Sequence, residues 1–184
     1  MSDTTPRDFI DKIDGAIARG EAFMLVAVLA TMIGLATLQL ILRKFFSSGF
    51  EWADVVVRQM VLWVGFVGGA HATYLGRHIA IDAVSKLLGP KRAAWLRVFN
   101  CIIAAVVTGI LLVVSYNYVV AERGEFFSAL GTEDSEAGSI ESWPFDTIMP
   151  FAFAAIVFHF VVAAKNHLLV AIGKREAPAE EVEA

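Results

Sequence analysis

Hydrophobic residues are gathered in four long runs along the chain, and none of these runs contains Asp, Glu, Lys or Arg. The runs are Ala22–Leu42, Gln59–Gly76, Val98–Ala121 and Thr147–Ala164. A bilayer core about 30 Å thick is crossed by roughly 20 residues of helix, and a charged side chain inside it is costly. The pattern therefore predicts an all-α membrane protein whose four transmembrane helices cover residues 22–42, 55–76, 96–121 and 147–168.

The composition supports this class. Of the 184 residues, 57% are hydrophobic, and the mean hydropathy is +0.64. Four spans leave no room for a separate soluble domain, so residues 1–184 are predicted to form a single membrane domain. The one cysteine, Cys101, falls inside the third run, where we expect it to be a small packing residue.

The segments outside the runs are amphipathic or acidic. Apolar and charged residues of the N-terminal segment fall on opposite faces of a helix, which is typical of a helix lying on a membrane surface. The predicted segments are a cytoplasmic surface helix over residues 1–21, a cytoplasmic interfacial segment over 79–89, an acidic periplasmic loop over 122–146 and a disordered cytoplasmic tail over 173–184.

Lysine and arginine are concentrated in three parts of the chain. They are Arg7, Lys12 and Arg19 before the first run; Arg77, Lys86, Lys91, Arg92 and Arg97 between the second and third; and Lys165, Lys174 and Arg175 after the fourth. Cytoplasmic connections carry the excess of basic residues in membrane proteins. Both chain ends and the middle connection are therefore predicted on the cytoplasmic side.

Small residues recur at intervals of four in the second run. Gly65, Gly69 and Thr73 form one such series, and Gly68 begins another. This spacing lets helix backbones approach closely inside a membrane. The close approach can serve packing among the four helices or contact with another membrane protein, and the pattern does not separate the two.

Charged residues mark the outer end of the second run. Glu51 and Asp54 stand at the start of the predicted helix, where negative charge is favoured, and Asp54 and Arg58 are four residues apart and can pair. Three interpretations are open for Arg58: a boundary ion pair, a contact with a partner helix, or a substrate-binding group.

Histidines suggest an alternative class of protein. His71 in the second run and His159 in the fourth are predicted at similar depths, so they can ligate a b-type haem if their helices face each other. A haem-bearing anchor of an electron-transfer complex is therefore the alternative hypothesis, and hydrogen-bonded packing histidines are the other reading. A third hypothesis is a stand-alone carrier or channel. Such a protein needs a line of polar residues across the midplane, and the sequence shows none. The sequence has no nucleophile–base pair, phosphate loop or HExxH pattern, and we predict neither an enzyme nor a metal or cofactor site.

An ordered motif then points to a family. The stretch from Trp52 to Asp82 resembles the small permease subunit of tripartite ATP-independent periplasmic (TRAP) transporters, the DctQ-like family. The matching positions are Trp52, Asp54, Arg58, Trp63, Phe66, Gly68 and Arg77-His78-Ile79-x-Ile81-Asp82. The sequence departs from the family at Val55, where a second acid is usual, and at Thr132–Trp143, which resembles an insertion in the outer loop.

The resemblance implies a supporting role in solute uptake. A subunit of this kind braces a large permease subunit that carries solute with sodium in the bacterial inner membrane, and it can help to dock a periplasmic solute-binding protein. The expected partners are those two proteins and membrane lipids, not nucleic acid, and the substrate class is an organic acid or another small solute. Expected partner-contact residues are Glu51, Trp52, Asp54, Arg58, Trp63, Gly65, Gly68, Gly69, Arg77, His78 and Asp82.

Overall fold

The computed structural model describes residues 9–76, 90–123, 126–128, 139–141 and 143–173. Its elements are α1 (Phe9–Phe46), α2 (Glu51–Tyr74), α4 (Pro90–Ala121), β1 (Phe126–Ser128), β2 (Ser139–Glu141), α5 (Trp143–Asp146) and α6 (Ile148–Ala171). Four helices are long and apolar enough to cross a membrane, which confirms the predicted all-α membrane class with four spans.

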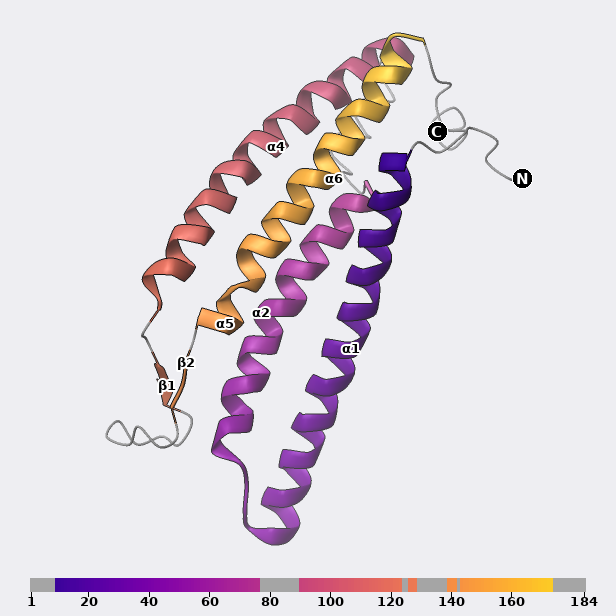
Figure 1. The fold of residues 1–184 in the computed structure, drawn as a ribbon. Helices are drawn as coiled ribbons and strands as arrows, with labels where there is room; N and C mark the ends of the chain where they lie inside the picture. Colours follow the sequence, from indigo (N-terminus) through magenta and orange to yellow (C-terminus); the bar gives the residue numbers. More distant parts are fainter. Residues whose placement is uncertain (1–8, 77–89, 124–125, 129–138, 142, 174–184) are drawn as a thin grey trace, which may run out of the picture.

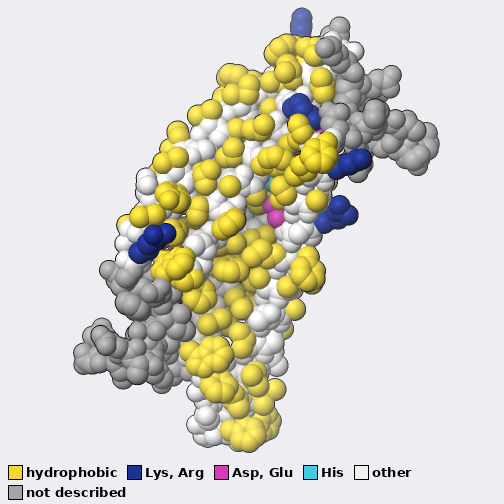
Figure 2. Space-filling view, viewed as in Figure 1, with side chains coloured by type: hydrophobic (Ala, Val, Ile, Leu, Met, Phe, Trp, Pro, Cys, Tyr) yellow, Lys and Arg dark blue, Asp and Glu magenta, His cyan; other side chains and the backbone are white. Residues whose placement is uncertain are grey.

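The long helices lie side by side in the order α4, α6, α2, α1 (Figure 1). Each packs mainly on its neighbour in this order, and α1 reaches α6 over a shorter contact. The helices thus form a single layer with α6 and α2 inside it and α4 and α1 at its edges. Figure 2 shows apolar side chains spread over one broad face of the layer. Exposed large hydrophobic side chains occur on all four long helices.

Small and apolar side chains join α4 to α6. Most buried residues of α4 lie three, four or seven positions apart and form one stripe, with buried Ala93 beside it: Ala94, Val98, Cys101, Thr108, Ser115 and Val119. Cys101 is buried and free, as predicted for a packing residue. The remaining faces of α4 carry exposed Ile, Val and Phe side chains, which suit lipid or another apolar partner.

The N-terminal segment differs from its prediction. Instead of a surface helix over residues 1–21 followed by a separate span, α1 is one uninterrupted helix of 38 residues that starts at Phe9. Its apolar side chains here point outward, with Phe9 77% exposed, and Glu21 is 8% exposed. The acidic face turns inward because it finds partners on α6 and α2, so the helix continues into the layer. Residues 1–8 lie outside the described part of the chain.

The described ends of three long helices are locally closed. At the end of α1, Ser47 has a φ of 47° and the amide of Ser48 bonds to the oxygen of Leu42, which closes the last turn. Gly76 ends α2 and Gly173 follows α6, both with positive φ. Gly76 therefore terminates a helix rather than extending the small-residue series. Within the predicted outer loop, β1 and β2 pair in antiparallel register with Phe127 opposite Ile140.

Candidate functional site

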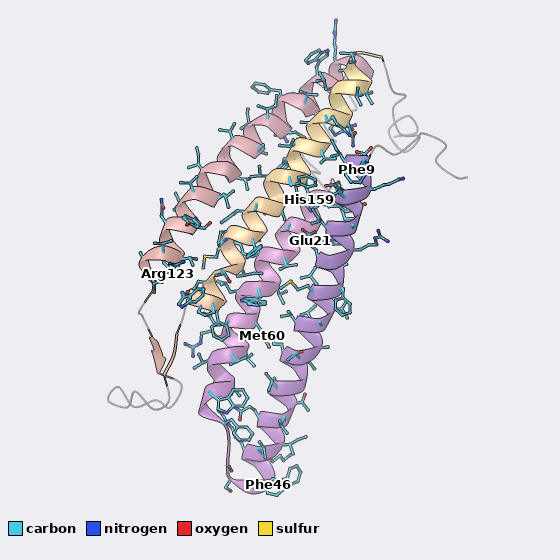
Figure 3. The ribbon with its side chains drawn as sticks, viewed as in Figure 1. Phe9, Glu21, Phe46, Met60, Arg123 and His159 are labelled. Carbon is cyan, nitrogen blue, oxygen red and sulfur yellow. The ribbon has the colours of Figure 1, made fainter. Side chains whose placement is uncertain are left out.

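The largest fully buried side chain among the described residues is a histidine of α6. His159 contacts carboxylates of α1 through both ring nitrogens: Nδ1 lies 2.7 Å from Oδ1 of Asp14, and Nε2 lies 3.1 Å from Oε1 of Glu21. Figure 3 shows His159 and Glu21 together between α6 and α1. The three side chains form a hydrogen-bonded triad that joins the two helices.

The carboxylate of Glu21 also faces α2. Its Oε2 lies 3.7 Å from Nδ1 of His71, too far for a hydrogen bond, and both atoms are buried without a hydrogen-bond partner among the described residues. The ring of Tyr74 lies near both imidazoles, with centroid separations of 6.3 Å from His71 and 5.5 Å from His159. Glu21 is therefore the point where α1, α2 and α6 meet.

A second polar contact continues the cluster toward the start of α1. Oδ1 of Asp11 accepts hydrogen bonds from Nζ of Lys165, at 3.1 Å, and from Nδ2 of Asn166, at 3.2 Å. Asp11, Asp14 and Glu21 are three and seven residues apart, so they share one helix face. We call Asp11, Asp14, Glu21, His71, His159 and Lys165 the inner cluster.

The haem hypothesis is contradicted by this geometry. The sequence predicted similar depths for His71 and His159, and the structure brings both near the carboxylate of Glu21. Iron ligation needs a free imidazole lone pair aimed at the metal. Both nitrogens of His159 face carboxylate oxygens instead, so this ring is not available as an axial ligand.

The acidic residue at the outer end of α2 pairs with a different arginine from the one predicted. Asp54 forms its ion pair with Arg43 of α1, not with Arg58, which is exposed. Gln39 supports the same junction, because its side chain accepts from the amide of Phe50 at 3.1 Å and donates to the Phe50 oxygen. The pairing joins the two helices across their short connection, where the carboxylate and guanidinium come from opposite sides of the hairpin.

Trp63 connects the middle of the chain to its last span. Its indole nitrogen donates to the backbone oxygen of Phe145 in α5, at 2.9 Å. In the same region Arg123 lies over the ring of Trp143, 5.8 Å from the centroid. These contacts join α5 to the middle of α2 and to the chain just after α4.

The predicted glycines of α2 face in different directions. A Cβ at Gly68 meets Leu25 of α1 at 3.9 Å, whereas one at Gly65 or Gly69 meets nothing within 4 Å. Gly68 therefore serves internal packing, and the line of Gly65 and Gly69 is open. Of the other predicted contact residues, Trp52 is 40% exposed and Glu51 is the first residue of α2. Arg77, His78 and Asp82 lie outside the described residues, as do the 79–89 segment and residues 174–184 of the predicted tail.

Sequence reasoning did not identify the acidic half of the inner cluster. The amphipathic pattern of the N-terminal segment predicts that its charged residues, Asp11 and Asp14 among them, face water, and it makes no prediction for the face of Glu21. A signal was available: these acids recur with Ala18 at intervals of three and four, the spacing of a buried helix face. His159 inside an apolar run was the matching signal on the other helix.

Taken together, the four apolar helices and the site define a multi-pass, all-helical membrane protein. Residues 32–169 match the family model described as the DctQ component of tripartite ATP-independent periplasmic transporters. This match covers most of the chain, and the chain belongs to the DctQ family of TRAP transporter small permease subunits. Members of this family are transporter components and not enzymes.

A curated relative agrees with the family assignment. The chain is 27% identical over 114 residues to the C4-dicarboxylate TRAP transporter small permease protein DctQ of Pseudomonas aeruginosa. The aligned region covers 62% of this chain and 53% of the relative, so the chain spans about half the length of the protein it matches.

Proposed function

We propose that the chain braces the large permease subunit of a TRAP system and does not itself carry solute. The observation that supports this most directly is the apolar packing between the inner cluster and the outer end of the layer. Phe66 of α2 packs edge-on against Phe153 of α6, with ring centroids 5.4 Å apart, and Val67 is 5% exposed. Within the described residues, a polar solute moving along the layer meets these apolar side chains, so the four helices offer it no polar path.

The open glycine line of α2 is the proposed contact with the large subunit. Gly65, Gly69 and Ala72 are exposed and lie along one face, where the backbone can approach another helix closely. Arg58 is exposed near the outer end of the same face and can pair with an acid of the partner. Gly68 and its neighbours on the other face already pack on α1. One face of α2 therefore serves packing within the chain, and the opposite face serves contact with the large subunit.

The remaining details follow from family membership and the charge distribution. We place the chain in the bacterial inner membrane with both ends in the cytoplasm, because most of the Lys and Arg residues lie at the two ends and in the middle connection. Uptake is driven by an ion gradient, of sodium, acting in the large subunit, and the periplasmic segments help to receive a solute-binding protein. A C4-dicarboxylate is the first solute to test, because the name of the P. aeruginosa relative includes that class of solute.

Co-purification tests the proposal. The tagged chain and the large permease subunit of the same organism are co-expressed, extracted in mild detergent and separated by size-exclusion chromatography. We expect one shared peak, and we expect Gly65→Leu to reduce the large subunit in that peak by at least about tenfold, equivalent to about 1.4 kcal/mol. Gly20→Leu is the matched control, because Gly20 of α1 also has nothing within 4 Å but lies on another helix. Separate elution of the two wild-type subunits would contradict the proposal.

A further inference from the structure

The hydrogen bonds of His159 cannot all form with the three side chains in their ordinary neutral-pH states. A neutral imidazole has one N–H donor and one lone-pair acceptor, and an ionised carboxylate only accepts. Both ring nitrogens of His159 face carboxylate oxygens, at 2.7 Å and 3.1 Å. With a neutral ring and two ionised carboxylates, one of these contacts would place a lone pair against a lone pair inside a buried site.

One additional proton removes this conflict. If it is on the ring, the imidazolium donates to both Asp14 and Glu21; if it is on a carboxyl group, that group donates to the unprotonated ring nitrogen. In either arrangement both hydrogen bonds form. The side chains that carry the site are well shielded, with exposed fractions of 0% for His159, 13% for Asp14 and 9% for Glu21. A buried contact without its hydrogen bond is costly, which favours retention of the proton.

We propose that Asp14, His159 and Glu21 form a proton-binding site between α1 and α6, which holds one proton more than the separate side chains carry at neutral pH. This goes beyond the bracing role and does not depend on it. The ligand is the proton itself, since the described residues contain no group of three or more side chains arranged to hold a metal ion.

The neighbouring histidine provides a second position for a proton. Nδ1 of His71 and Oε2 of Glu21 face each other at 3.7 Å, and both are buried and without a hydrogen-bond partner among the described residues. A proton on His71 converts this contact into an ion pair with Oε2 of Glu21. His71 is the more accessible end of the site, with 25% of its side chain exposed.

Each helix packed around the site contributes to its charge. α1 supplies Asp14, Glu21 and, next to them, Asp11; α2 supplies His71 and the hydroxyl-bearing ring of Tyr74; and α6 supplies Lys165 in addition to His159. α4 packs on α6, but the charged groups that act on the His159 ring are the two carboxylates of α1. The number of protons bound at Asp14, His159 and Glu21 therefore governs how firmly α1 is held against α6.

Spectroscopy of the ¹⁵N-histidine-labelled chain in lipid nanodiscs tests the proposal at neutral pH. Nitrogen chemical shifts distinguish an imidazolium from a neutral ring, and infrared spectra report a protonated carboxyl group. The His159 signals are assigned by elimination with His71→Gln, His78→Gln and His167→Gln, and these variants serve only for assignment; the protonation state is measured in the wild-type chain. We expect either an imidazolium at His159, or a neutral ring together with a protonated carboxyl band that disappears in Asp14→Asn or Glu21→Gln.

A matched pair of acid variants supplies the control. Glu21→Gln replaces the carboxylate by an amide that can donate to a neutral ring, so the additional proton should be lost from the triad. Glu122→Gln, at the end of α4, should leave the spectra of the site unchanged. A neutral His159 ring in the wild-type chain with no protonated carboxyl at Asp14 or Glu21 would overturn the proposal, and this result needs no variant of the triad to fold.

Discussion

The indole nitrogen of Trp63 donates to the backbone oxygen of Phe145, 2.9 Å away and 82 residues later in the chain. This contact fixes α5 against α2 at the point where the chain turns into its last span. It explains why a tryptophan stands at this position: its large apolar ring packs in the layer while its N–H donates to a backbone carbonyl.

Replacing Trp63 by phenylalanine should weaken the outer end of the layer. Trp63→Phe keeps an aromatic ring but leaves the Phe145 oxygen without this donor, and hydrogen bonds between helices in membranes contribute about 0.6 kcal/mol on average and up to about 1.7. We expect a small decrease in the melting temperature of the purified chain in detergent. Trp95→Phe, at a residue that is 53% exposed, is the control and should have no measurable effect.

Gln39 should be important for the α1–α2 hairpin. Its amide bonds to both the N–H and the oxygen of Phe50, so Gln39→Leu removes two contacts at a buried position. We expect a loss of about 1–3 kcal/mol in unfolding free energy, from polar groups left without partners. Leu40→Ala, at a neighbouring residue that is 65% exposed, tests whether the effect is specific to the amide. An equal loss in both variants would show that the hydrogen bonds between Gln39 and Phe50 contribute little to stability.

The glycines of α2 offer a test of internal against external packing. Leucine at Gly68 must displace Leu25 of α1, which already lies 3.9 Å from the position of an added Cβ, whereas leucine at Gly65 enters open space. Overpacking costs typically about 1–3 kcal/mol. Gly68→Leu should therefore lower the thermal stability of the isolated chain, and Gly65→Leu should not. The assignment of the two faces is wrong if the variants behave alike in the isolated chain.

His159 should contribute much more to the stability of the folded chain than its apolar surroundings suggest. His159→Leu leaves the carboxylates of Asp14 and Glu21 buried without their partner, and breaking a buried charged pair costs about 3–5 kcal/mol. Because acid protonates and neutralises these carboxylates, the stability lost at neutral pH should be partly recovered as the pH falls. Thermal unfolding of the variant across pH measures this recovery.

A triple variant separates the charge effect from packing. Adding Asp14→Leu and Glu21→Leu to His159→Leu removes the buried charges together, and such replacements are often neutral or stabilising. The triple variant should be more stable than His159→Leu alone and should lack its pH dependence. A triple variant less stable than the single one would show that the triad acts through shape rather than charge.

The sequence was sufficient to predict the four helices but not their order in the layer. The helices follow from long charge-free runs, a signal that depends on composition and length. Their order does not follow, because α4 carries apolar side chains on several sides, and the sequence does not show that the stripe around Cys101 is the buried one. Asp11 and Asp14 of α1 were misassigned for a related reason: amphipathicity predicts that charges face water, whereas Asp14 faces His159. The partner of Asp54 was not predicted, because Arg58 is the nearest arginine in sequence. Arg43 is eleven residues away and reaches Asp54 only because the chain turns between α1 and α2.

The most direct test of the bracing role is the thermal stability of the large permease subunit measured with and without this chain. The large subunit is purified from cells that express it alone or together with the 184-residue chain, and its melting temperature is followed by a label on the large subunit. We expect the chain to raise that temperature by at least about 5 °C, because a partner that binds only the folded state stabilises it. An unchanged melting temperature, with the two proteins eluting apart, would contradict a bracing role.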